Sequence, residues 1–561
     1  MPLQKNQVLT LQVERLSSDG SGVAHSPEGE TVFIPGAAPG DEARVRIVKD
    51  CKRYAFGILD EVLKPSPDRI PVDCAVAGPC GGCSLRHLDY AAELRAKQEN
   101  VADAFARIGG LDVPVLPIVG SPEIDRYRNK VQFPVGTDKA GRPCIGFYAG
   151  RTHRIVPCPD CRLQPGVLNE IGNTLCAFFA EKGIHPYNEE TGKGLVRHIF
   201  LRRGAHSGQI MVCLVSTRAK LPSAEELCTR LKEAFPDIVT ILLNVNAKNT
   251  NVILGSETHT LYGQGYIEDT LCGVPVQLGP LSFYQVNTLA AEQLYGIAAE
   301  YAQLTPDDLL LDLYCGMGTI GLSMADHCRE LVGVEIVPEA IESAKANAAR
   351  MGAAVSAKSR FFCADAGQAA AQLAAEGLHP DVVMLDPPRK GCDEATLSAV
   401  VRMAPRRVVY VSCNPATAAR DAAWLEQNGY HAEKVQPVDL FPRTKHVETV
   451  VLLSHKKADS YIHIDVEFGE GEGKIPVDSI AKRAEAYKPK EKVTYKMIKE
   501  YIEAKYGFKV HTAYIAEVKR NLGLPMYDAP NAVEELKQPR KHPTPEKIEA
   551  IKDALRYFAV I

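Results

Sequence analysis

Cys413 closes an apolar run, Arg-Val-Val-Tyr-Val-Ser-Cys, that we expect to be a β-strand. Ligand sites collect at the carboxyl ends of strands in an open α/β sheet, so a thiol at this place is a candidate nucleophile. Its chemistry suits methylation of carbon 5 of uracil, because that carbon is not nucleophilic enough to take a methyl group unaided. Addition of a thiolate to carbon 6 converts carbon 5 into an enolate-like centre that can attack a sulfonium methyl group.

The second half of this reaction requires a base, because the proton on carbon 5 must leave before the enzyme is expelled. Glu448, in the segment Phe-Pro-Arg-Thr-Lys-His-Val-Glu, is the candidate, since a buried carboxylate can be tuned to accept a proton. His446 in the same segment is the alternative base, although a single histidine near a strand is more often a packing residue.

A loop with two glycines, Leu-Asp-Leu-Tyr-Cys-Gly-Met-Gly-Thr at residues 311–319, follows an apolar run and precedes a predicted helix. Its glycines allow the backbone to approach a ligand. The next strand is expected to end at Glu335, about 20 residues on, where a carboxylate can accept both ribose hydroxyls of a nucleoside. A third strand is expected to end at Asp365, near an adenine amino group. No third glycine completes a dinucleotide fingerprint and no P-loop lysine follows, so a methionine-derived nucleoside fits better than NAD or ATP.

Asp386 is expected at the end of another strand, followed by Pro387 and Pro388, which fix an extended turn. Methyltransferases that act on exocyclic amines typically place an aromatic residue after such a pair of prolines. Arg389 follows here, which disfavours that class of enzyme.

Three cysteines lie close together in Cys-Ala-Val-Ala-Gly-Pro-Cys-Gly-Gly-Cys, residues 74–83. A site of four thiolates needs one more ligand, and Cys158 and Cys161 are both candidates. Zinc sites usually contain two short Cys-x2-Cys hairpins. Residues 74–83 contain only one, so this segment favours an iron–sulfur cluster over zinc.

The motifs DLYCGMGT, LDPPRKG, VSCNP and FPRTKHVETV, together with Phe283-x-Gln285-x-Asn287, resemble the RNA 5-methyluridine methyltransferase family in order and spacing, across roughly residues 7–455. The resemblance implies S-adenosylmethionine as methyl donor, Cys413 as nucleophile and Glu448 as proton acceptor. Some relatives carry Asn at the position of Thr319. The residues that it implies as contacts of the donor or the base are Gln285, Tyr314, Thr319, Glu335, Asp365 and Asp386.

The branch of this family that acts on bacterial 23S ribosomal RNA has a TRAM domain and a [4Fe–4S] cluster, and the same resemblance selects Cys161 as the fourth ligand. The implied cluster ligands are Cys74, Cys80, Cys83 and Cys161. We therefore expect methylation of a uridine in 23S ribosomal RNA. Transfer RNA is the alternative substrate, and a non-catalytic iron–sulfur RNA-binding or assembly factor is the alternative from another functional class.

The elements that position these residues fall into four predicted domains. Residues 1–63 alternate apolar and polar residues between glycine-rich turns, which is typical of an OB-like β-barrel, and they resemble the TRAM domain. Residues 64–280 are expected to form an α+β RNA-binding domain with the cysteine site, whose helix at 91–110 packs on the catalytic domain. Strands alternate with Ala-rich helices over residues 281–455, which predicts a Rossmann-like, doubly wound α/β methyltransferase domain. Residues 456–561, rich in Lys, Glu and Tyr, predict a small α-rich accessory domain.

The composition is that of a soluble globular protein, with 45% hydrophobic and 24% charged residues in a chain of 561. The formal net charge of −4 gives no overall attraction to nucleic acid, so RNA contacts must come from local basic patches. No apolar run is long enough to span a bilayer, the first residues do not resemble a signal peptide, and 16 mostly scattered cysteines indicate a reducing compartment. We expect a cytoplasmic monomer that binds RNA and neither DNA nor membranes.

Overall fold

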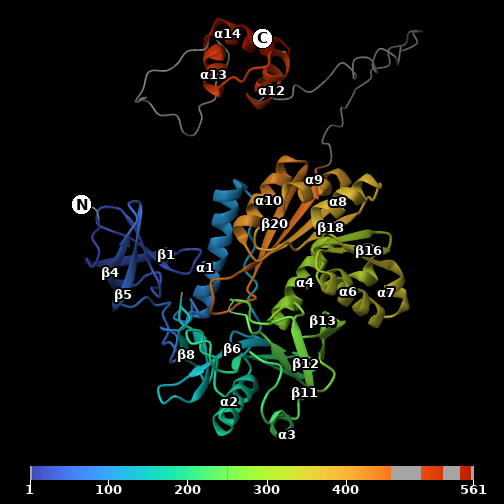
Figure 1. Cartoon of the computed structure of the whole chain (residues 1–561). Helices are drawn as coiled ribbons and strands as arrows, with labels where there is room; N and C mark the ends of the chain where they lie inside the picture. The colour runs from blue at the N-terminus through green and yellow to red at the C-terminus, as the bar shows by residue number, and fades with distance from the viewer. Residues whose placement is uncertain (1–2, 151, 249, 457–494, 522–543, 558–561) are drawn as a thin grey trace. The chain divides into compact units, whose positions relative to one another are not determined.

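The computed structural model describes residues 3–150, 152–248, 250–456, 495–521 and 544–557. The chain divides into two compact units, Met1–Tyr461 and Ile462–Ile561. The first unit contains a β-barrel and two large sheets (Figure 1). All of the predicted site residues belong to this unit.

The N-terminal strands form a closed barrel in the order β1-β2-β3-β5-β4. Ala43, Val45 and Ile47 alternate along β4 and are fully buried, because successive side chains of a strand point to opposite faces. The predicted N-terminal barrel is confirmed. Its strands are β1 (Val8–Leu16), β2 (Gly22–His25), β3 (Thr31–Ile34), β4 (Glu42–Asp50) and β5 (Tyr54–Lys64).

A seven-stranded sheet follows, in the order β12-β11-β10-β9-β6-β7-β8. Its strands are β6 (Lys130–Thr137), β7 (Pro143–Tyr148), β8 (Ile155–Pro157), β9 (Val196–Arg203), β10 (Ile210–Ser216), β11 (Ile238–Val245) and β12 (Glu257–Tyr262). Helices α2 (Gly166–Glu181) and α3 (Ala224–Ala234) share one hydrophobic core with this sheet. A hairpin, β13 (Ile267–Leu271) and β14 (Val274–Leu278), connects it to the last sheet.

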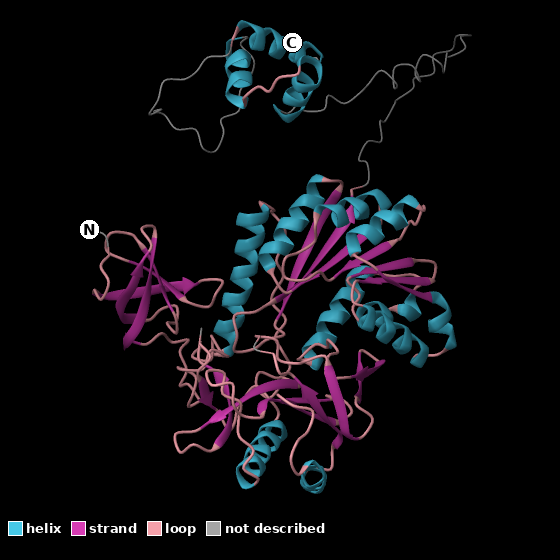
Figure 2. Cartoon of the chain, in the orientation of Figure 1, coloured by secondary structure: helices cyan, strands magenta, loops and turns pink. Residues whose placement is uncertain are grey.

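The third sheet has the order β17-β16-β15-β18-β19-β21-β20, in which β21 runs antiparallel to both of its neighbours, β19 and β20, and the other six strands are parallel to one another. Helices cover both of its faces (Figure 2). The predicted doubly wound methyltransferase domain is confirmed. Its strands are β15 (Leu309–Leu313), β16 (Glu330–Glu335), β17 (Ser359–Cys363), β18 (Val382–Leu385), β19 (Arg407–Ser412), β20 (Tyr430–Val438) and β21 (Glu448–His455). Its helices are α4 (Thr288–Ala302), α5 (Thr319–Ser323), η2 (Ala325–His327), α6 (Pro338–Arg350), α7 (Ala353–Lys358), α8 (Ala366–Ala375), α9 (Glu394–Met403) and α10 (Pro415–Gln427).

One helix of the third sheet's outer layer comes from far earlier in the chain. Helix α1 (Tyr90–Asp103) continues as a π-helix, η1 (Ala104–Gly109), and the two lie beside α10 (Figure 1). Phe105 of η1 is buried in the same hydrophobic core as Tyr410 of β19. The segment that follows the cysteine motif is therefore packed directly on the methyltransferase domain.

The second unit contains α12 (Tyr495–Tyr506), α13 (Thr512–Asn521) and α14 (Pro545–Tyr557). Ile502, Ile515 and Ile551 form part of their common apolar core. The described part of the predicted accessory domain is thus helical, and its residues 457–494, 522–543 and 558–561 lie outside the described ones. In the described ranges, no helix has the length and apolar character needed to cross a membrane.

Candidate active site

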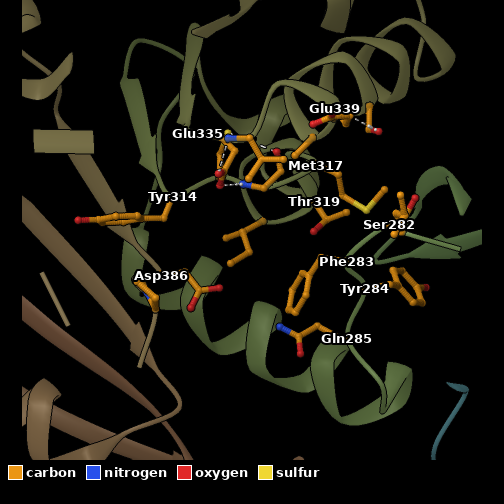
Figure 3. A pocket seen from close by; sticks show the side chains of 18 of the residues that line it. Ser282, Phe283, Tyr284, Gln285, Tyr314, Met317, Thr319, Glu335, Glu339 and Asp386 are labelled. Atoms are coloured by element: carbon orange, nitrogen blue, oxygen red, sulfur yellow. Dashed lines mark hydrogen bonds between the residues drawn. The ribbon is translucent and has the colours of Figure 1, made fainter. Parts of the chain in front are cut away.

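A cavity of about 1320 Å³ lies at the carboxyl ends of β15, β16, β18 and β19 (Figure 3). Residues 279–286 and strands β6 and β12 form another part of its wall. The volume exceeds the roughly 300–1,000 Å³ of most small-molecule sites, so it can hold a donor and a base together. All eight predicted catalytic and donor-site residues line it: Gln285, Tyr314, Thr319, Glu335, Asp365, Asp386, Cys413 and Glu448.

The loop between β15 and α5 depends on its glycines. Gly316 and Gly318 have φ angles of 54° and 76°, and Tyr314 is also left-handed at 65°. A β-carbon on Gly318 would lie 3.2 Å from side-chain carbons of Leu322 and Ala344, which is too close without a shift of these neighbours. The turn therefore keeps the backbone of the loop at the cavity wall, where a ligand can approach it.

The Glu335 carboxylate lies across this loop at the end of β16. Its Oε2 accepts a hydrogen bond from the backbone N–H of Gly316 at 3.2 Å, and its Oε1 accepts from Ile336 and Val337 at 2.8 and 2.9 Å. These bonds fix the carboxylate at the edge of the cavity (Figure 3). A fixed acceptor pair of this kind suits the two hydroxyls of a ribose.

The sequence predicted a strand that ends at Asp365. In the structure this strand, β17, ends two residues earlier, at Cys363. Oδ1 of Asp365 accepts hydrogen bonds from the backbone N–H groups of Gly367 and Gln368, both at 3.1 Å, and so caps the first turn of α8. The residue therefore stabilises α8 as well as lining the cavity.

The loop before α4 carries Phe283 and Gln285 into the cavity (Figure 3). The phenyl side chain of Phe283 is 73% exposed, which marks a contact surface. Arg202 of β9, 1% exposed, holds this loop by donating to the carbonyl oxygens of Gly279 and Ser282 at 2.8 and 2.7 Å. Arg202 is not among the residues predicted from the sequence, although a charge inside the apolar strand VRHIFLRR was a signal for it.

A second cation, also missed from the sequence, stands directly opposite Arg202. Lys130 pairs with Arg202 across β6 and β9, and it lines the cavity. Burial, with the charges of Arg202 and Arg128, lowers the pKa of Lys130 to about 8, and burial lowers the pKa of Arg202 to about 10. Like charges opposite each other destabilise a sheet, and Lys130 is the one of the two that lines the cavity, where it suits a bound anion.

Cys413 and Glu448 reach the cavity from two antiparallel strands. Ser412, the last residue of β19, pairs with Thr449 of β21, so Cys413 and Glu448 are the next residues on each side. Burial and the Glu448 carboxylate raise the pKa of the Cys413 thiol, while Arg389 opposes them through a hydrogen bond and its charge. Arg389, to which the sequence analysis gave no role at the thiol, thus faces the nucleophile.

Three carboxylates are buried around this centre. Burial raises the pKa of Asp386 to about 7, and those of Asp312 and Glu448 to about 8. Oδ2 of Asp312 accepts a hydrogen bond from Gly321, whereas its buried Oδ1 has no hydrogen-bond partner. Asp386 and Glu448 line the cavity, and a bound cation would favour their ionised forms, so this part of the wall fits the positively charged sulfonium of S-adenosylmethionine.

His446 lies close to the same group of residues. Nδ1 of His446 is 3.5 Å from a guanidinium nitrogen of Arg389. Burial, together with the charge of Arg389, lowers the pKa of His446 to about 4. Of the two candidate bases, Glu448 therefore has the greater affinity for a proton.

The cysteine segments converge on a second cavity of about 80 Å³. Five thiols line it: Cys74, Cys80, Cys83, Cys158 and Cys161. Among the residues that the structure describes, no three His, Cys, Asp or Glu side chains are grouped to hold a metal ion. The structure thus brings the predicted ligands together without showing a metal site.

Arginines surround this second cavity. Arg86, 4% exposed, forms ion pairs with Asp73 and Asp125, and Arg128 and Arg162 also line the cavity. Burial raises the pKa of Cys83 to about 11, and the charge of Arg86 opposes this rise.

Two family models match the chain. One is described as tRNA (Uracil-5-)-methyltransferase and matches residues 277–456, and the other is the TRAM domain, which matches residues 2–59. These matches cover the third sheet and the N-terminal barrel.

The chain is also similar to complete proteins. It is 43% identical over 456 residues to an uncharacterized RNA methyltransferase of Halalkalibacterium halodurans and 42% identical over 454 residues to one of Bacillus cereus, and in both cases the match covers 81% of this chain and 98% of the relative. A solved structure, the Pyrococcus abyssi tRNA (uracil-54, C5)-methyltransferase in complex with S-adenosyl-L-homocysteine, aligns with 80% of this chain and 100% of its own, at a TM-score of 0.63 and 27% identity.

Proposed function

Because the chain belongs to the family of S-adenosylmethionine-dependent RNA (uracil-5-)-methyltransferases, we propose that it methylates carbon 5 of a uridine in 23S ribosomal RNA through a covalent bond from Cys413 to the base. The observation that carries this proposal is the shared cavity, which Cys413, Glu448 and the donor-side residues all line. Enzymes that act on a base take it out of the stack, and a cavity of this size accommodates a flipped nucleotide beside the donor.

Cys413 starts the reaction. Its thiolate, stabilised by Arg389, adds to carbon 6 of the uracil, and the electron pair of the C5–C6 double bond moves toward carbon 5 and O4. Carbon 5 then takes the methyl group that bound S-adenosylmethionine would supply, and the electron pair of the broken sulfur–methyl bond stays on the donor sulfur.

Glu448 completes the reaction. Its carboxylate removes the proton from carbon 5, and the electron pair of that C–H bond restores the C5–C6 double bond. The sulfur of Cys413 leaves carbon 6 and takes the electron pair of the C6–S bond. A pKa of about 8, raised by burial, makes Glu448 a stronger base than an exposed carboxylate.

The donor-side residues have distinct tasks in this proposal. Glu335 accepts from the ribose hydroxyls, and Asp365 lies near the adenine. Asp386 contributes negative charge near the sulfonium or accepts a hydrogen bond from the uracil ring. The remaining contacts with the donor or the base are assigned to Gln285, Tyr314 and Thr319.

For the second cavity we propose a [4Fe–4S] cluster held by Cys74, Cys80, Cys83 and Cys161. The cysteine pattern of residues 74–83 is the basis for preferring a cluster to a single zinc ion. Arg86, Arg128 and Arg162 place positive charge beside the cavity that the thiols line.

The RNA substrate is assigned by the combination of domains. By the family resemblance, members that act on bacterial transfer RNA generally lack both the TRAM barrel and the cysteine quartet, and this chain has the barrel and the converging cysteines. Transfer RNA is the second candidate, because the similar Pyrococcus abyssi enzyme is a tRNA (uracil-54, C5)-methyltransferase. We expect the protein to act in the cytoplasm as a monomer.

The test uses RNA that contains 5-fluorouridine. Fluorine cannot leave carbon 5 as a proton does, so the wild-type enzyme with S-adenosylmethionine should be trapped as a covalent adduct on a denaturing gel. The C413A variant should form none, and an adduct that persists in C413A would overturn the role of Cys413. Competition between unlabelled 23S ribosomal RNA and transfer RNA for this adduct then decides between the two substrates.

A further inference from the structure

The proposed base is held by a loop that joins two antiparallel strands. Glu448 is the first residue of β21, it pairs with Val438 at the end of β20, and residues 439–447 connect them. Phe441 and His446 of this loop line the reaction cavity together with Glu448. The path of the loop therefore decides where the carboxylate lies.

Four charged side chains are buried at the base of this loop. Lys97 of α1, 1% exposed, donates to Oε1 of Glu93 at 2.8 Å and to Oδ1 of Asp439 at 2.7 Å, and both carboxylates are fully buried. The guanidinium of Arg443 lies 3.7 Å from Oε2 of Glu93 and completes a set of two cations and two anions. Charges at this depth are stable only in such a paired arrangement.

The same groups hold the backbone of the loop. Nζ of Lys97 donates to the carbonyl oxygen of Phe441 at 3.1 Å. Oε1 of Glu93 accepts from the backbone N–H of Arg443 at 2.7 Å, and Oδ1 of Asp439 accepts from that of Phe441 at 3.0 Å. Side chains from α1 thus bind the loop backbone on both sides of Pro442.

Other segments bond further carbonyl groups of the loop. The Tyr127 hydroxyl donates to the carbonyl oxygen of Pro442 at 2.9 Å, and Nδ2 of Asn287 donates to that of Leu440 at 3.0 Å. The backbone N–H groups of Ser84 and Leu85 donate to the carbonyl oxygen of Arg443 at 3.0 and 3.1 Å. Ser84 directly follows Cys83, so the cysteine segment is attached to the same loop. The loop is fixed from several sides, and the buried charges form its inner support.

We propose that Lys97 and Glu93 are positioning residues for Glu448, which act by fixing the loop from which its carboxylate reaches carbon 5 of the uracil. This inference rests on the proposed function. Neither Lys97 nor Glu93 lines the reaction cavity, so both act through the loop and not on the substrate. Glu448 is needed only after the methyl group has been transferred. Loss of either residue therefore slows the release of methylated RNA more than it slows covalent addition.

The experiment compares K97M with the wild type in single turnovers on transcribed 23S ribosomal RNA, with a methyl-labelled donor. We expect a covalent RNA–enzyme adduct that already carries the label to accumulate, as it should in E448Q, with product release at least tenfold slower. Binding of S-adenosyl-L-homocysteine should be unchanged. R95M is the matched control on the same helix, because Arg95 pairs with Asp68 at the surface, and it should release product at the wild-type rate.

A second variant covers the case in which K97M folds poorly. E93Q keeps an oxygen that can accept the Arg443 N–H, and it should also accumulate the labelled adduct, to a smaller extent. Release at the wild-type rate in folded K97M and E93Q, with E448Q accumulating adduct, would overturn the positioning role alone. A parallel loss of melting temperature and of adduct formation in both variants, without any excess of labelled adduct, would also overturn it. If E448Q itself forms no labelled adduct, the assignment of Glu448 as base fails, and this inference fails with it.

Discussion

The Glu448 carboxylate raises the pKa of the Cys413 thiol, its neighbour across β19 and β21. Two negative charges side by side in a buried site disfavour each other. The proposed reaction needs them at different stages, because the sulfur is an uncharged thioether, bonded to carbon 6, when the carboxylate removes the proton. The thiolate of Cys413 and the carboxylate of Glu448 can therefore lie side by side, because each carries its negative charge at a different stage of the reaction.

The rate of product release should increase with pH up to about 8. Glu448 must be ionised to accept the proton, and burial raises its pKa to about 8, so below that pH most molecules carry a protonated, inactive carboxyl group. The release rate should then rise about tenfold per pH unit and level off above pH 8. Single-turnover measurements between pH 6 and 9.5 test this, and a rate that falls with rising pH in this range would contradict an ionised base.

R389M should slow covalent addition. Arg389 holds the pKa of Cys413 down through a hydrogen bond and its charge, so without Arg389 that pKa should rise further. A hydrogen bond to a charged group contributes about 1.5–3 kcal/mol. Adduct formation with 5-fluorouridine RNA should be about tenfold slower at pH 7 and should recover at higher pH. R402M changes an exposed arginine of α9 and serves as the control. Equal rates for R389M and the wild type at pH 7 would show that Arg389 does not stabilise the thiolate.

The sequence predicted the residues whose chemistry is written in local motifs. Cys413 follows the apolar run of β19, so its place at the carboxyl edge of the sheet could be foreseen. Glu448 begins β21, which runs antiparallel to β19, and this reversal brings it to the same edge. Arg389 could be noticed in the sequence because it stands where an aromatic residue would follow the two prolines. Its contact with Cys413 could not be predicted, because it depends on how two loops fold. Lys97 binds Asp439 across a separation of 342 residues, and no local periodicity can indicate such a pair. The barrel and the doubly wound sheet were predictable because alternation and strand–helix rhythm are local properties.

G318A should weaken donor binding and lower stability. The residue has a φ of 76°, and an added β-carbon would lie 3.2 Å from carbons of Leu322 and Ala344. The strain and crowding should cost about 1–3 kcal/mol and reduce the affinity for S-adenosyl-L-homocysteine about tenfold. G377A is the matched control, because Gly377 has a φ of 81° with no atom within 4 Å of the added carbon. Calorimetric titration and melting temperatures should show the backbone strain in both variants but the loss of affinity only in G318A.

C80S should lose iron. The protein purified without oxygen should contain about four iron atoms and four acid-labile sulfides per chain if the second cavity holds a cubane. C80S should retain little of either, whereas C144S, a change in β7 outside the cavity, should retain both. Elemental analysis that finds zinc in place of iron in the wild type would contradict the cluster.

E448Q should make the ligand-free protein more stable at alkaline pH. The folded-state pKa of Glu448 is raised by burial from 4.5 to about 8, so between these values the unfolded chain releases a proton that the folded chain keeps. Stability that is present below about pH 4.5 is therefore lost progressively as the pH rises to 8. Glutamine matches the neutral carboxyl in shape and does not ionise, so the advantage of E448Q over the wild type should grow from near zero at pH 4.5 to about 3–5 kcal/mol at pH 9. Melting temperatures of the two proteins should thus coincide in acid and separate in alkali, and the same difference at both extremes would show that Glu448 ionises in the folded protein as readily as in the unfolded chain.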